Sequence, residues 1–130
     1  QLVDFTDISH QLNILDLKIT NEFWNLIRGN INNLDDLKFW WNIVYGDIKE
    51  VPFDQDFKNL ALQTLPKDRF DKNTWSIWTN SLMNESGKKG KELFKPLRLC
   101  LTGQSNGPEM ENLVLVMGRK KIKERLINNN

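Results

Sequence analysis

The sequence is poor in the side chains that most hydrolytic or metal-dependent chemistry needs. Its 130 residues contain one cysteine, Cys100, and one histidine, His10. A single cysteine excludes an internal disulfide and a multi-cysteine zinc site. His10 lies in no nucleophile motif and is interpreted as a surface histidine, whereas Cys100 lies in an apolar run and is interpreted as a buried thiol. We therefore predict no catalytic residue and no metal ligand.

Long apolar runs and phosphate loops are also absent from the sequence. No run approaches the ~20 apolar residues that span a bilayer, and the polar start at Gln1 does not resemble a signal peptide. The segment KKGK at 88–91 has the wrong order for a phosphate-binding loop. The adjacent acids Asp35 and Asp36 fit the first turn of a helix better than a catalytic pair. We expect a cytoplasmic protein with no membrane partner and no cofactor bound to these residues.

Charge is distributed unequally along the chain. Residues 1–65 carry five Lys/Arg against ten Asp/Glu, a net charge of −5, and residues 66–130 carry thirteen against seven, a net charge of +6. A basic half on a nearly neutral chain favours a polyanionic partner on one side. A solvated, lysine-rich surface fits the same charge distribution equally well.

Helical periodicity dominates the apolar positions, and no alternating pattern rivals it. The sequence predicts a helix over about 21–31 capped by Thr20, and a second that begins after Asn33 and ends at Gly46. After an extended link at 50–53, a third helix begins at Asp54 and is stopped by Pro66. A fourth begins near Asp71 or Asn73. The fold class is therefore all-α.

The last third predicts three further short helices. The first contains the apolar residues of 93–101 and ends at Thr102-Gly103, with Pro96 tolerated only in a first turn or at a kink. The second begins with Pro108 as its first residue and is broken by Gly118, and the third covers 119–126. The basic segment 86–90 is a candidate linker. It divides the chain into a first helical subdomain with its N-terminal connecting segment, 1–86, and a second helical subdomain, 87–130.

Five tryptophans are the most distinctive apolar feature: Trp24, Trp40, Trp41, Trp75 and Trp78. Their helical spacing favours core packing. Adjacent helix residues point about 100° apart, so an alternative is that one of the Trp40–Trp41 pair is exposed. An exposed indole can stack on a nucleobase or contact a partner helix.

Basic residues gather in two segments of the C-terminal half. The phosphate-backbone candidates among them are Lys88, Lys89, Lys91, Lys95, Arg119 and Lys120, and the second segment continues through Lys121, Lys123 and Arg125. A positive face there would make phosphate binding salt-dependent, although cations near a helix end are also ordinary dipole partners. Arg98 differs, because leucines flank it and its planar fork is suited to directed hydrogen bonds with a base edge. The polar loop 104–107 follows.

Several of these segments resemble the C-terminal region of bacterial glutamyl-tRNA synthetases. They are GKELFKPLRLCLTG at 90–103, GPEM at 107–110, MGR at 117–119, FWNLIRGN at 23–30 and DKNTW at 71–75. The resemblance covers roughly residues 12–126. It implies an all-α cage of two subdomains that binds the anticodon stem-loop of tRNA(Glu).

The resemblance also implies roles for individual residues. Arg98 matches an arginine that reads an anticodon base, and Gly107 and Pro108 match a loop at the anticodon. Some family members have threonine at the position of Gly107, so only backbone contacts transfer there. Arg28 and Asn30 lie in the segment that resembles the first anticodon-binding subdomain and are further candidates for anticodon binding.

The parent enzyme that the resemblance implies attaches glutamate to tRNA(Glu) with ATP and magnesium. Its ATP-binding signatures of the His-Ile-Gly-His and Lys-Met-Ser-Lys-Ser types are absent from this sequence, so we expect a fragment that binds tRNA without catalysing. We also expect it to be monomeric and to join a catalytic domain of the same chain. One alternative is a helical protein–protein adaptor with a groove of tryptophans and leucines. A small enzyme of another kind is the other.

Overall fold

Side-chain caps fix where three of the helices begin. A computed structural model describes residues 19–48 and 54–127. The side chain of Thr20 accepts a hydrogen bond from the backbone N–H of Phe23 at 3.0 Å, before helix α2 (Asn21–Ile27). Asn33 caps α3 (Leu34–Tyr45) in the same way, and Asp54 caps α4 (Gln55–Thr64). All three caps were predicted, and each contributes about 1 kcal/mol.

The remaining helices complete an all-α fold. They are α5 (Thr74–Ser86), α6 (Lys91–Thr102) and α7 (Met110–Ile127), and no strand occurs within 19–48 or 54–127. The predicted fold class is confirmed. His10 and the extended link 50–53 lie outside the described residues.

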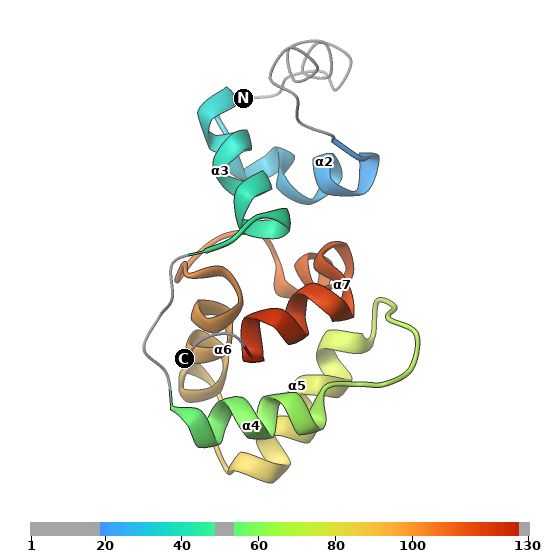
Figure 1. Cartoon of the computed structure of the whole chain (residues 1–130), viewed down its shortest axis with the longest axis vertical. Coiled ribbons are helices and arrows are strands. Elements are labelled where there is room, and N and C mark those ends of the chain that lie inside the picture. Colours follow the sequence, from blue (N-terminus) through green and yellow to red (C-terminus); the bar gives the residue numbers. More distant parts are fainter. Residues whose placement is uncertain (1–18, 49–53, 128–130) are drawn as a thin grey trace.

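Helix α7 lies at the centre of the arrangement. It contacts each of α2, α3, α4, α5 and α6, and Figure 1 shows it between α6 and the α4–α5 pair, with α2 and α3 at the opposite end of the molecule. The buried apolar residues form one cluster that draws on both sides of residue 87. A subdomain boundary at 86/87 stays a prediction.

Several predicted boundaries were imprecise. The helix expected over 21–31 ends at Ile27 and continues as a 3-10 turn, Arg28–Asn30. Pro108 is not the first residue of a helix, because α7 begins two residues later at Met110. Pro96 lies beyond the first turn of α6, which nevertheless runs unbroken over Lys91–Thr102. The buried leucines on either side of it hold the helix in place at the cost of one backbone hydrogen bond.

Gly118 divides α7 as the sequence predicted. Its backbone has φ 81° and ψ 162°, outside the helical region, so the helix is kinked between Met117 and Arg119. Residues with a Cβ rarely adopt a positive φ, which explains a glycine at this point. The kink lets both halves of α7 face the core, because Val114 and Ile122 are each fully buried.

The tryptophans serve mainly as core residues. Trp24, Trp40 and Trp78 are buried, whereas Trp41 and Trp75 are half-buried and pack against the same cluster. The alternative that one of the Trp40–Trp41 pair is exposed was therefore wrong, since Trp41 still packs against Tyr45 with ring centroids 5.4 Å apart. The prediction that Cys100 is a buried thiol is confirmed.

Candidate functional site

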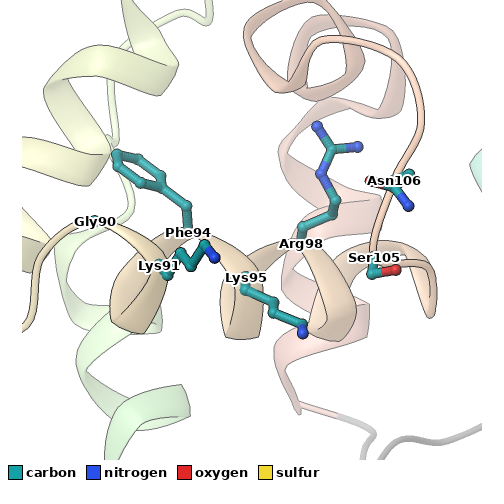
Figure 2. A pocket seen from close by; sticks show the side chains of 7 residues that line it. All are labelled: Gly90, Lys91, Phe94, Lys95, Arg98, Ser105 and Asn106. Carbon is teal, nitrogen blue, oxygen red and sulfur yellow. The ribbon is translucent and has the colours of Figure 1, made fainter.

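A pocket of about 560 Å³ lies between helix α6 and the loop that follows it. Figure 2 shows its lining side chains on the N-terminal part of α6 and on the loop that follows the helix. The lining residues are Gly90, Lys91, Phe94, Lys95, Arg98, Ser105 and Asn106. Three cations and a polar loop around one cavity make it a site for an anionic or acceptor-rich ligand.

Arg98 carries the strongest indication of a ligand. Its Nη1 is buried yet makes no hydrogen bond to any residue that the structure describes. Burial lowers the pKa of Arg98 from its usual value, although arginine stays protonated in proteins. An unpaired buried donor costs about 1–3 kcal/mol, so a bound acceptor would recover that free energy.

Helical spacing places the other cations beside Arg98. Lys91, Lys95 and Arg98 fall on one side of α6 at intervals of four and three residues, where helical side chains are neighbours. The opposite side is apolar, because Leu93 and Leu97 are fully buried. Lys91 and Lys95 are exposed, so the pocket has a basic rim open to solvent.

The loop after α6 is held by short-range hydrogen bonds. The hydroxyl of Thr102 donates to the carbonyl of Arg98 at 2.8 Å and accepts from the backbone N–H of Gln104 at 3.0 Å. Gly103 ends the helix with φ 74°. These contacts turn the chain back so that Ser105 and Asn106 face the Arg98 side of the pocket.

Gly107 and Pro108 directly follow Asn106 in the chain and do not line the pocket. Pro108 is buried, and a Cβ built on Gly107 would lie 2.3 Å from Cη2 of Trp40. The close approach of Gly107 to Trp40 seats the loop against α3. A backbone contact of either residue with an anticodon stays a prediction.

The structure does not bring Arg28 and Asn30 to the pocket. Both are exposed in the 3-10 turn after α2, and neither lines the cavity. Their proposed contact with an anticodon also stays a prediction. Lys88 and Lys89 lie nearer to the pocket, since they immediately precede Gly90 at its edge.

The second basic segment does not form the continuous positive face that its spacing suggested. Arg119 donates to the backbone carbonyls of Pro66 and Asp68, and its guanidinium lies 4.6 Å from the centre of the Phe70 ring. Arg119 therefore anchors the loop before α5. Its role as a phosphate-backbone candidate stays a prediction, as does that of the exposed Lys120.

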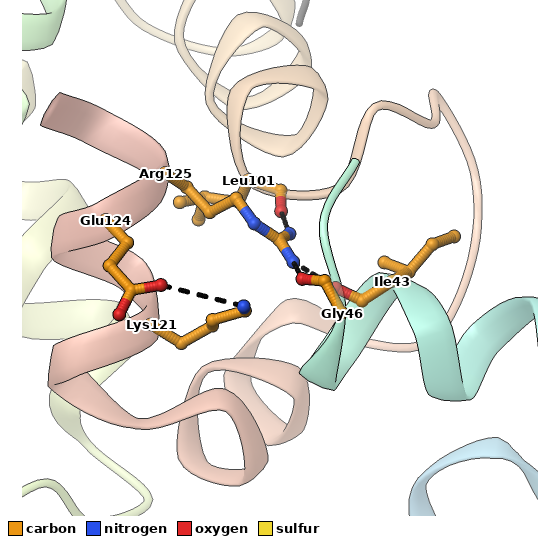
Figure 3. Close-up of polar contacts among 6 residues, drawn as sticks. All are labelled: Ile43, Gly46, Leu101, Lys121, Glu124 and Arg125. Carbon is orange, nitrogen blue, oxygen red and sulfur yellow. Dashed lines mark hydrogen bonds and ion pairs between the residues drawn. The ribbon is translucent and has the colours of Figure 1, made fainter. Parts of the chain in front are cut away.

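Arg125, in the same segment, is a buried structural residue. It is only 5% exposed and donates to the carbonyls of Leu101, Ile43 and Gly46, three contacts that Figure 3 shows. Burial lowers its pKa, and the nearby Asp47 acts in the opposite direction. Lys121 forms an ion pair with Glu124 at 3.6 Å. The position of Arg125 beside Leu126 and three residues after Ile122, on the apolar side of its helix, was the signal for burial.

Neither a membrane-spanning helix nor a metal-ligand cluster occurs among the described residues. Within 19–48 and 54–127, no helix combines the length and apolarity needed to cross a bilayer. In the same ranges, no three His, Cys, Asp or Glu side chains gather where they could hold a metal ion.

The fold and the pocket define a small all-helical domain with a basic, arginine-containing binding site. Residues 13–129 match the family model described as "Anticodon binding domain". The chain belongs to this family of anticodon-binding domains.

Relatives of this chain are named as ligases. It is 39% identical over 127 residues to "Glutamate--tRNA ligase 1" of Rickettsia felis, covering 95% of this chain and 28% of that protein. It is 43% identical over 103 residues to the protein of the same name from Maricaulis maris, covering 79% and 23%. The chain thus spans about a quarter of the length of these relatives. No solved structure matches it.

Proposed function

We propose that this chain recognises the anticodon stem-loop of tRNA(Glu) as the C-terminal part of a glutamate–tRNA ligase. Two observations support the proposal: the family of anticodon-binding domains to which the chain belongs, and relatives named for ligation of glutamate to tRNA. The observation that carries it structurally is the unpaired Nη1 of Arg98 in a basic pocket.

Arg98 and the lysines have different tasks in this proposal. An anticodon base leaves its stack and offers an acceptor on its edge to the guanidinium of Arg98, the usual way proteins read sequence in single-stranded RNA. The exposed side chains of Lys89, Lys91 and Lys95 and the half-buried Lys88 contact phosphates, which adds affinity without selecting a base. Base recognition and phosphate binding thus fall to different side chains of the pocket.

The rest of the enzyme supplies the chemistry. ATP and magnesium act in the parent's catalytic domain, which attaches glutamate to the tRNA that this domain helps to select. We further propose that the parent is cytoplasmic and monomeric. The alternative of a helical protein–protein adaptor is not favoured, because the family model and the named relatives both indicate tRNA recognition.

Replacing Arg98 with alanine tests the reading role. We expect Arg98→Ala to weaken binding of a tRNA(Glu) anticodon stem-loop about tenfold and to reduce the preference for that hairpin over hairpins with altered anticodons. Electrophoretic-mobility titrations at low salt measure both. Lys72→Ala, which removes an exposed charge outside the pocket, is the matched control and should leave the preference intact. Unchanged affinity and preference in Arg98→Ala would show that Arg98 does not read a base.

Removing the lysines should change affinity in a different way. We expect the Lys91→Ala/Lys95→Ala double variant to weaken binding of all hairpins to a similar extent, because phosphates are common to every sequence. The slope of log Kd against log salt concentration should become smaller by about one to two, which corresponds to the loss of one to two phosphate contacts. The measurement is a salt titration of wild type and variant. A selective loss for one anticodon would instead assign these lysines to a base.

A further inference from the structure

Phe94 is an aromatic residue in an unexpected position on α6. It is 38% exposed, although the buried face of the helix is formed by other residues, among them Leu93, Leu97 and Leu101. Phe94 lies beside Lys95 on the side of the helix that lines the pocket, and one helical turn before Arg98. A substantial part of this large ring therefore faces solvent at the pocket instead of the core.

A series of aromatic contacts holds the ring in place. Phe94 lies against Trp75, with centroids 6.2 Å apart and ring planes inclined by 39°. Trp75 contacts Trp78 edge-to-face at 5.8 Å. Trp78 is fully buried, and its Nε1 donates to the carbonyl of Ala61 at 2.9 Å. The ring of Phe94 thus has a rigid support on one side while it also borders the open pocket.

The pocket combines an aromatic ring, an unpaired donor and exposed cations within two turns of one helix. Figure 2 shows Phe94 and Arg98 projecting from the same side of α6, with Ser105 and Asn106 beyond Arg98. Stacking on an aromatic ring accepts any nucleobase, because every base has a π-face. The acceptors on a base edge match the free Nη1 of Arg98, and the adjoining phosphates match Lys91 and Lys95.

We propose that Phe94 is the stacking platform for one unpaired nucleobase, whose edge then meets Arg98. This inference rests on the proposed function and adds a residue to the same site. The volume of about 560 Å³ is within the range of pockets that enclose small ligands. A phosphate alone would use the three cations and leave the ring without a role.

Abasic hairpins test the platform directly. Each anticodon nucleotide of the stem-loop is replaced in turn by an abasic residue, which keeps the phosphate and removes the base. We expect Phe94→Ala to weaken binding of the intact hairpin about tenfold and to lose nearly all of that effect on one abasic hairpin. Phe94→Leu keeps apolar volume without a π-face and should lose affinity similarly, whereas Phe94→Tyr should bind like wild type.

Two controls separate the possible failures. Ile77→Ala removes another exposed apolar side chain, 55% exposed on α5 and outside the pocket, and should leave binding unchanged. Circular-dichroism melts of all variants establish that each is folded. An equal effect of Phe94→Ala on every abasic hairpin, or wild-type binding by Phe94→Leu, would overturn the platform while leaving a dependence on Arg98 intact. Absence of hairpin binding by the wild-type chain would contradict the proposed function itself.

Discussion

Replacing Arg125 with alanine should cost the domain about 3–5 kcal/mol of unfolding free energy, the largest effect expected from any single side chain described here. The guanidinium donates to three carbonyl oxygens, those of Leu101, Ile43 and Gly46. Without it, all three oxygens lose this donor, and those of Leu101 and Ile43 lie in buried surroundings. Because a domain of this size is stable by only about 5–15 kcal/mol, the loss is a large fraction of the total.

The position of the three carbonyls explains why an arginine serves here. Leu101 lies in the last turn of α6 and Ile43 in the last turn of α3, where carbonyls have no partner within their own helix. A cation at a helix C-terminus is also favoured by the helix dipole. One side chain of α7 thus satisfies the ends of two helices and ties α3 to α6, the helix that carries the pocket.

The measurement is thermal and denaturant unfolding followed by circular dichroism. We expect the melting temperature of Arg125→Ala to fall by more than about 10 °C. Lys123→Ala removes the same charge from the same helix at an exposed position, and should change stability by less than about 0.5 kcal/mol. Arg125→Lys should be intermediate, because one ammonium group does not span all three carbonyls. Equal melting temperatures for Arg125→Ala and Lys123→Ala would contradict a role of Arg125 in tying α3 to α6.

Local chemistry made much of the fold predictable. The caps Thr20, Asn33 and Asp54 and the break at Gly118 depend on a few neighbouring residues, so the sequence alone indicated them correctly. Arg125 was placed on a charged surface because its charge was weighed before its position between apolar neighbours. Its true partners come from α3 and α6, and no local pattern shows that these helix ends lie beside α7.

The candidate site was predictable in part for the same reason. Arg98 and the lysines of α6 were identified from flanking leucines and from charge, and the structure places Arg98, Lys91 and Lys95 around one pocket. Phe94 was counted only among the apolar residues of its helix and was not singled out as a binding residue. Phe94 lies three residues from Leu97 as well as from Lys91, so its spacing alone did not separate it from the buried leucines.

The contact between Gly107 and Trp40 leads to the second large effect. We expect Gly107→Ala to destabilise the domain by about 2–4 kcal/mol and to weaken hairpin binding. The new Cβ would lie 2.3 Å from Cη2 and 2.8 Å from Cζ2 of the Trp40 ring, and overpacking of this kind costs about 1–3 kcal/mol. The φ of Gly107, 152°, adds backbone strain for any residue with a side chain.

Binding should suffer because the loop carries part of the pocket. Ser105 and Asn106 line the cavity directly before Gly107, so a loop that moves away from Trp40 displaces both. Gly103→Ala is a control for a positive φ without a steric clash, since its Cβ would meet only Cδ1 of Ile48 at an ordinary 3.7 Å. A larger loss of hairpin binding in Gly107→Ala than in Gly103→Ala is expected, because only Gly107 meets the Trp40 ring.

A double-mutant cycle with Trp40→Phe decides whether this contact seats the loop. Phenylalanine lacks the outer ring of the indole, which contains the atoms that the new Cβ would meet. Gly107→Ala should therefore cost about 1–2 kcal/mol less in the Trp40→Phe background than in wild type, a coupling typical of residues in contact. Strain from the positive φ should remain in both backgrounds. Strict additivity of the two substitutions, in both unfolding and hairpin binding, would show that Trp40 does not set the position of the loop.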